Sequence, residues 1–255
     1  MRTPWLLLCL PSCVCAEPLM RSEGVASSAD GRVAYREVHW QRGPGDGSER
    51  WVQYLCPDGR PFARKTMPAS TLPLARGYWL QDRRSGQVAS VKVADRTVQL
   101  RWKEDAASFV RDGQVVLPAG AVIDVGFDAA VRLHWQTLMR DGRVRLPFLV
   151  PGRARFYPVE VRRVGDVQWQ GEPALAMEVK LDTWYGGVAP RLALTYAKAD
   201  RRLLEFRGTS NLRDARGHYP VVTVRFAEAA VAGSAREWQQ AIAQPLVERC
   251  DAAAP

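Results

Sequence analysis

Histidines are the first side chains to consider for chemistry. The chain has only three, His39, His134 and His218, and none has another ligand-type side chain at the short spacing typical of a zinc site. His134 lies beside Trp135, and its ordinary interpretation is a partly buried ring satisfied by one hydrogen bond. The sequence therefore predicts no metal site and no cofactor.

Common catalytic motifs are also missing from the sequence. There is no Gly-x-Ser-x-Gly elbow, no glycine-rich phosphate loop ahead of a helix and no Ser-x-x-Lys. Two carboxylates such as Glu104 and Asp105 adjoin turn-like sequence, and a glycosidase pair could come from distant strands without leaving a sequence mark. No catalytic residue is assigned, and an enzyme acting on envelope polymers, with carboxylates or His134 at a cavity mouth, stays an alternative hypothesis.

The N-terminal residues have the pattern of an export signal. Arg2 supplies a positive end, an apolar stretch follows, and Val14-Cys15-Ala16 offers small residues to a signal peptidase. We therefore expect residues 1–16 to be a signal peptide and the mature protein to be periplasmic. The alternative is a buried N-terminal strand or helix. Leu10-Pro11-Ser12-Cys13 also resembles a lipobox, so a lipid anchor on Cys13 is a second hypothesis.

Cysteine usage agrees with export. Three of the five cysteines, Cys9, Cys13 and Cys15, lie in the expected signal, which leaves Cys56 and Cys250 in the mature chain. Two thiols in an oxidising compartment usually pair, so we predict a disulfide that ties the C-terminal segment to an early strand. The alternative is two buried, inert thiols. Neither has a CxxC spacing or an adjacent histidine.

The protein is strongly basic. The 255 residues include 36 Lys and Arg against 27 Asp and Glu, a net charge of +9, and arginines form scattered doublets such as Arg83-Arg84 and Arg162-Arg163. An ordinary solvated surface is the simpler interpretation, and attraction to anionic lipid headgroups or acidic envelope polymers is the alternative. Nucleic acid is not an expected partner, because the chain has no recognisable nucleic-acid-binding motif. No stretch after the N-terminus approaches the roughly 18 apolar residues of a membrane-spanning helix, so we expect a soluble mature chain.

Alternating apolar and polar residues predict many β-strands. Within 97–102, Val98, Leu100 and Trp102 share one face while polar residues occupy the other. The same period of two recurs at 157–161, 175–181 and 222–226. Further strands are expected at Val33–Gln41, Trp51–Cys56, Phe62–Thr66, Gln87–Val93, Arg143–Val150, Arg191–Ala197 and Leu203–Thr209.

Turn residues between these strands predict antiparallel neighbours. We expect tight turns at Pro57-Asp58-Gly59, Ser85-Gly86, Asp112-Gly113 and Gly186-Gly187, where glycine can adopt a positive φ. Strands do not alternate regularly with helices, so a parallel doubly wound sheet is not expected.

Two helices interrupt the strand pattern. Apolar residues at helical spacing predict one helix from Asp128, a candidate N-cap, to Met139, with Gly142 able to end it. Ser234 and Glu237 form a capping box for a second helix, expected to kink at Pro245.

These elements predict a mainly β (α+β) fold for residues 17–255, as a single β-rich domain. We expect one strongly curved antiparallel sheet, a half-barrel or barrel, with the first helix packed on its concave side and the second at the C-terminus. A curled sheet hides strand edges and creates a cavity.

Aromatic residues are the candidates for lining that cavity or its mouth. Trp184 and Tyr185 precede the expected Gly186-Gly187 turn, and Phe148 lies in an apolar run between prolines. Plain core packing is the alternative for any single aromatic. The predicted ligand-binding residues are Trp102, His134, Trp135, Phe148, Trp184 and Tyr185.

Four short segments resemble those of an uncharacterised family of exported Gram-negative proteins. They are Cys56-Pro57-Asp58-Gly59-Arg60-Pro61-Phe62-Ala63, Gly126-Phe127-Asp128, Phe148-Leu149-Val150-Pro151 and Ser210-Asn211-Leu212-Arg213-Asp214. The resemblance spans most of the expected mature chain and implies no known activity or catalytic residue. By architecture alone, the chain also resembles the half-barrel carriers that move lipoproteins or lipids across the periplasm.

The leading hypothesis is a periplasmic binding or carrier protein for an apolar or lipid-like molecule. Its affinity would come from apolar area inside the sheet, with arginines at the rim for an anionic headgroup. The alternatives are the envelope-polymer enzyme and a non-catalytic assembly factor that holds an envelope protein or the membrane surface through an exposed sheet edge or aromatic patch.

Overall fold

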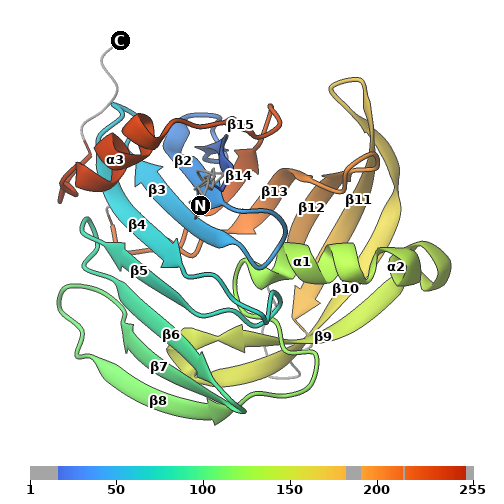
Figure 1. The fold of residues 1–255 in the computed structure, drawn as a ribbon, viewed down its shortest axis with the longest axis horizontal. Helices are drawn as coiled ribbons and strands as arrows, with labels where there is room; N and C mark the ends of the chain where they lie inside the picture. Colours follow the sequence, from blue (N-terminus) through green and yellow to red (C-terminus); the bar gives the residue numbers. More distant parts are fainter. Residues whose placement is uncertain (1–16, 182–190, 215, 251–255) are drawn as a thin grey trace, which may run out of the picture.

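The computed structural model describes residues 17–181, 191–214 and 216–250. Their strands form a curved, open sheet with the shape of a half-barrel (Figure 1). The strands are β1 (Leu19–Ser27), β2 (Val33–Arg42), β3 (Glu49–Leu55), β4 (Pro61–Met67), β5 (Tyr78–Asp82), β6 (Val88–Ala94), β7 (Thr97–Lys103), β8 (Arg111–Val116), β9 (Arg143–Val150), β10 (Arg155–Trp169), β11 (Glu172–Leu181), β12 (Arg191–Ala197), β13 (Leu203–Thr209), β14 (Val221–Arg225) and β15 (Val231–Ala232). The helices are α1 (Gly126–Leu133), α2 (Trp135–Asp141), the short 3-10 turn η1 (Pro151–Arg153) and α3 (Ala235–Ala243).

All of these strands belong to one antiparallel sheet. Its order is β8-β7-β6-β5-β4-β3-β2-β1-β14-β13-β12-β11-β10-β9, and β15 pairs with β1. Strands β8 and β9 are the two ends of this order, so the sheet is curved but not closed into a barrel. The predicted fold class is confirmed.

The two ends of the sheet approach each other without pairing. A Cβ added to Gly152 in η1 would lie 3.2 Å from the Trp102 ring of β7. The chain between β8 and α1 also partly covers the β9 edge, because the Val122 amide donates to the Pro147 carbonyl at 2.8 Å. One edge of the sheet is therefore shielded from pairing with another chain.

The helical segment after β8 lies across the concave side of the sheet. Val131, Trp135 and Leu138 pack against Val161 and Met177 in one core cluster. Where we predicted a single helix, the structure has two, because the chain leaves helical geometry at His134 (φ −91°, ψ 12°).

The start of the first helix also differs from the prediction. Asp128 lies in the first turn of α1 and is not the N-cap. The helix begins at Gly126, where a Cβ would lie 1.9 Å from the Leu74 carbonyl oxygen, so a larger residue would force the two segments apart. Gly142 ends α2 in the left-handed conformation, as expected.

On the convex side of the sheet, α3 covers a cluster of tryptophan side chains. The Trp238 ring makes edge contacts with Trp40 and Trp51, at centroid distances of 5.7 and 5.1 Å. The predicted capping box of Ser234 and Glu237 is present. The helix ends at Ala243 and does not continue through a kink at Pro245, because the residue before a proline favours extended backbone.

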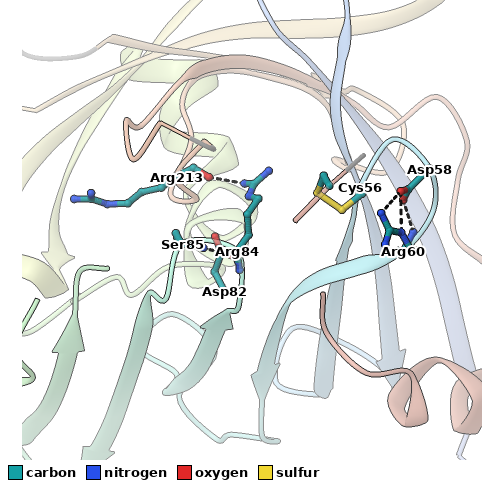
Figure 2. Close-up of a disulfide and its surroundings, with 8 residues drawn as sticks. Cys56, Asp58, Arg60, Asp82, Arg84, Ser85 and Arg213 are labelled. Atoms are coloured by element: carbon teal, nitrogen blue, oxygen red, sulfur yellow. Dashed lines mark hydrogen bonds and ion pairs between the residues drawn. A yellow bond between two sulfur atoms is a disulfide. The ribbon is translucent and has the colours of Figure 1, made fainter. Parts of the chain in front are cut away.

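A disulfide fixes the end of this C-terminal segment. Cys56 and Cys250 are bonded, with their Cα atoms 5.3 Å apart, which confirms the predicted pair. Figure 2 shows the bond beside the β3–β4 turn, in which the Asp58 carboxylate accepts hydrogen bonds from the Arg60 backbone amide and guanidinium. On the other side, the Arg84 guanidinium donates to the Arg213 carbonyl (Figure 2).

The predicted strands are present, and one predicted turn is wrong. Asp112 and Gly113 lie inside β8, paired with Arg101 and Leu100. Gly113 has no positive φ there, and it sits close to Ala154, whose Cβ is 3.1 Å from the Cβ position of residue 113. The turns at Gly59 and Gly86 do have positive φ. The turn expected at 186–187 lies outside the described residues.

No helix among the described residues has the length and apolar character needed to span a membrane.

Candidate functional site

The concave side of the sheet holds a cavity of about 440 Å³. It lies between the strands and the start of α1, which contributes Phe127 and Asp128 to its lining. The predicted export signal, residues 1–16, lies outside the described residues. The cavity is the candidate functional site.

One wall is apolar and comes from β10 to β14. In β12, Leu192 and Leu194 face the cavity, because alternate residues of a strand share a face. Cross-strand pairing places Val179 beside Leu192 and Phe206 beside both Leu194 and Val224. We call these strands the apolar wall.

The opposite wall comes from β2 to β4 and carries polar groups. Tyr35, Glu37 and His39 are alternate residues of β2, and all three line the cavity. On the other face of β2, Val38 and Trp40 pack in the aromatic cluster under α3, whereas Arg36 is exposed. The part of β2 that carries Val38 and Trp40 is therefore covered on both faces. We call β2 to β4 the polar wall.

A buried ion pair lies on the polar wall. The Lys65 ammonium is 2.7 Å from Asp124 Oδ2, and the two side chains are 3% and 20% exposed. Burial acts to lower the pKa of Lys65, but the charge of Asp124 and its hydrogen bond outweigh burial and raise the pKa above its usual value. Lys65 is therefore a cation at neutral pH, with a partner.

The α1 end of the cavity holds a second carboxylate. The Tyr196 hydroxyl donates to Asp128 Oδ1 at 2.6 Å. Burial and the charge of Asp128 raise the pKa of Tyr196 well above its usual value, so the phenol stays protonated and keeps donating. Tyr196 thus joins the apolar wall to α1.

Two further polar pairs complete the polar wall. His39 Nε2 is 2.8 Å from Glu37 Oε2, and the His39 ring makes an edge contact with Phe226 at 5.5 Å. The Tyr35 hydroxyl and Ser210 Oγ are 3.1 Å apart. Burial is the main cause that raises the pKa of Tyr35, so it is a neutral phenol. The wall therefore offers hydrogen-bonding groups that are mostly committed to neighbours.

The residues predicted from the sequence are distributed differently. Phe148 lines the cavity. Trp102 packs on η1, His134 is half-buried at the junction of α1 and α2, and Trp135 contacts Tyr196 from behind, at a centroid distance of 6.5 Å. The other two, Trp184 and Tyr185, lie outside the described residues. A ligand-binding role for these aromatics stays a prediction.

Sequence reasoning missed the polar residues of the cavity. Tyr35, Glu37 and His39 are spaced two apart in a predicted strand, which is the signal that they share one face. Lys65 and Asp124 are 59 residues apart, and no sequence pattern joins them. The arginines expected at the rim do not appear in the lining, as far as residues 17–181, 191–214 and 216–250 show.

No cluster of three or more His, Cys, Asp or Glu suited to a metal ion occurs in the described part of the chain. The charged groups of the cavity instead have partners among the described residues: Lys65 pairs with Asp124, and Glu37 and Asp128 are hydrogen-bonded to His39 and Tyr196.

Comparisons with known proteins give fold-level likeness only. No family model matches the sequence, and no curated protein matches it. A crystal structure of a β-barrel-like protein of the domain of unknown function DUF1849 from Brucella abortus is similar, with 6% identity, 86% of this chain and 99% of that chain covered, and a TM-score of 0.43. A domain named as an outer membrane lipoprotein-sorting protein from Vibrio parahaemolyticus has 8% identity, 90% and 92% coverage and a TM-score of 0.28.

These two structures are of the same two kinds as the resemblances drawn from the sequence, a domain of unknown function and a lipoprotein-sorting domain. At 6% and 8% identity and TM-scores of 0.43 and 0.28, they assign no ligand and no activity to this chain.

Proposed function

We propose that this protein binds and carries an apolar or amphiphilic molecule in the cell envelope. The observation that carries the proposal is the cavity of about 440 Å³ with one wall built from β10 to β14 side chains. Ligand sites are typically concave, mostly apolar and about 300–1,000 Å³ in volume, with a few placed polar groups. The expected signal at residues 1–16 is the reason for placing the function in the envelope.

Binding energy would come from apolar area removed from water. Each Å² of apolar surface buried contributes about 25 cal/mol, and Val179, Leu194 and Phe206 present such surface to the cavity. The paired polar groups opposite would orient a ligand through one polar end. A ligand held in this way is shielded from water during transfer between membranes.

The test is retention of a hydrophobic molecule. Protein exported to the periplasm of a Gram-negative host and purified without detergent should show bound lipid by native mass spectrometry. Val179→Trp fills the cavity and should lose that lipid, whereas Val167→Trp, at a side chain that is 39% exposed on β10, should keep it. Spectra at the bare protein mass for the unmodified chain, together with no binding of the fluorescent dye N-phenyl-1-naphthylamine, would refute the proposal.

One observation favours a second candidate, a hydrolase. The hydrogen-bonded Glu37–His39 pair faces the cavity, and a histidine oriented by a carboxylate can act as a general base. His39 would take a proton from water as the water attacks an ester, and would return it to the leaving alkoxide, giving an acid and an alcohol. Release of nitrophenol from 4-nitrophenyl dodecanoate that is lost in His39→Gln would support this candidate, and equal release by both proteins would exclude it.

A further inference from the structure

We propose that the cavity selects amphiphiles whose polar end donates hydrogen bonds, with a long-chain primary ammonium preferred, and that it rejects anionic ends. This rests on the proposed function, because it takes the cavity to be the ligand site. The starting point is a contrast in charge. The whole chain has a net charge of +9, but the charged groups in the described lining are Glu37, Asp124 and Asp128 against Lys65.

Lys65, the one cation in the described part of the lining, is already paired. Lys65 Nζ lies 2.7 Å from Asp124 Oδ2 and its side chain is 3% exposed. A fatty-acid carboxylate entering the cavity would have to compete with Asp124 for the same ammonium. Burying an anion without a counter-charge is unfavourable, and apolar contacts would have to offset that cost.

Two arginines near the α1 end of the cavity are also engaged. Arg132 donates to both oxygens of Asp46, at 3.1 and 2.5 Å, and the Arg50 guanidinium is 3.5 Å from Asp46. The charge of Asp128 acts on both arginines as well and favours their charged forms. Neither arginine belongs to the lining, so neither offers a free cation to a headgroup.

Glu37 is the lining carboxylate that can still accept a hydrogen bond from a ligand. Its Oε2 accepts from His39, whereas its Oε1 has no hydrogen-bond partner among the described residues. The Glu37 side chain is 13% exposed, so water does not fully screen its charge. A carboxylate accepts hydrogen bonds and attracts cations, which makes Oε1 a receptor for an ammonium or, more weakly, for a hydroxyl.

The discriminating experiment compares three twelve-carbon ligands of equal length. Dodecylamine, dodecanol and dodecanoate would compete at pH 7.4 with the neutral dye N-phenyl-1-naphthylamine. We expect dodecylamine to bind at least about tenfold more tightly than dodecanoate, with dodecanol between them. Dodecanoate binding as tightly as dodecylamine would overturn this inference and leave the proposed function intact. Failure of all three and of the dye would refute the proposed function itself.

Two substitutions locate the selectivity. Glu37→Gln should weaken dodecylamine about tenfold and leave dodecanol unchanged. Asp124→Asn frees the Lys65 ammonium and should strengthen dodecanoate about tenfold; asparagine tolerates the left-handed backbone at this position, where φ is 46°.

The matched control is Asp141→Asn, at an exposed carboxylate of α2 that pairs with Arg140; it should change no affinity. If Asp124→Asn fails to fold, Glu37→Gln still decides the matter. Unchanged dodecylamine affinity in Glu37→Gln would contradict the assigned receptor group.

Discussion

The two walls of the cavity differ in the side chains that their strands place on the cavity face and on the convex face. In the apolar wall, β11 places Val179 on the cavity and Glu178 on the convex side, where Glu178 pairs with Arg162 and Arg191. In the polar wall, β2 places Glu37 on the cavity and Trp40 on the convex side, under α3. One wall is apolar inside and charged outside, and the other is polar inside and aromatic outside.

Because of this difference, we expect a ligand to gain most of its affinity at the apolar wall and to be oriented by the polar wall. The apolar wall offers area and few directional contacts. The polar wall offers fixed groups such as Lys65 and Glu37, and it needs support from its other face because polar groups alone would not hold three strands against the core. The C-terminal segment supplies that support through Trp238 and the Cys56–Cys250 bond.

The largest expected effect comes from removing the disulfide. Cys250→Ala should cost about 4 kcal/mol in the free energy of unfolding, because the bond closes a very long loop. Urea unfolding measures the loss, and hydrogen exchange locates it. Faster exchange should concentrate in β3, β4 and α3, while β11 and β12 keep their protection. Equal loss of protection on both walls would contradict the conclusion that the disulfide supports the polar wall in particular.

Breaking the buried ion pair should have the next largest effect. Lys65→Met leaves Asp124 without its counter-charge and should cost about 3 kcal/mol. Leu194→Ala, in the apolar wall, should cost about as much through the cavity it creates. The two variants test whether the walls are stabilised by different kinds of interaction.

Their pH dependence separates the two. The folded-state pKa of Lys65 is raised, so its contribution to stability is fully present below the usual lysine pKa and is lost as pH rises through the higher folded value. The destabilisation by Lys65→Met should therefore be constant from pH 7 to about pH 10 and shrink above it. Leu194→Ala should show the same loss throughout, as measured by urea unfolding at each pH. A flat profile for Lys65→Met would remove the electrostatic distinction between the walls.

The smallest expected effect is at the helix cap. Ser234 Oγ accepts from the Glu237 amide at 3.1 Å, and Ser234→Ala should cost about 1 kcal/mol, with Ser234→Gly costing less. Trp238 fluorescence would report the fraying of α3. Dye affinity in the cavity should be unchanged, and a weakened affinity would mean that support of the polar wall is coupled to binding more closely than the structure indicates.

Sequence patterns predicted the fold well where one strand face meets water. In β7 and β11 the alternation is clean, and the observed strands match it. Sequence patterns were a weaker guide in β8. Asp112-Gly113 has the composition of a tight turn but lies in extended backbone, because pairing with β7 overrides local preference. The break at His134 between α1 and α2 likewise has no sequence signal.

The candidate site was harder to predict than the fold. Its shape depends on contacts between residues far apart in sequence, such as Lys65 with Asp124 and Tyr35 with Ser210. The predicted aromatics were chosen for size and position near turns, and only Phe148 of those described lies in the lining. The polar face of β2 was readable from spacing, but nothing in the sequence showed that the opposite face of β2 would also be covered.

The bond between Cys56 and Cys250 also determines when during synthesis the C-terminal segment can be fixed. Ribosomes make the chain from its N-terminus, and the two sulfurs are separated by 194 positions. The Cys56 thiol can therefore form this bond only after the chain has been made as far as Cys250. A chain that stalls or is truncated before Cys250 cannot form this bond, so it lacks the covalent link between the C-terminal segment and β3.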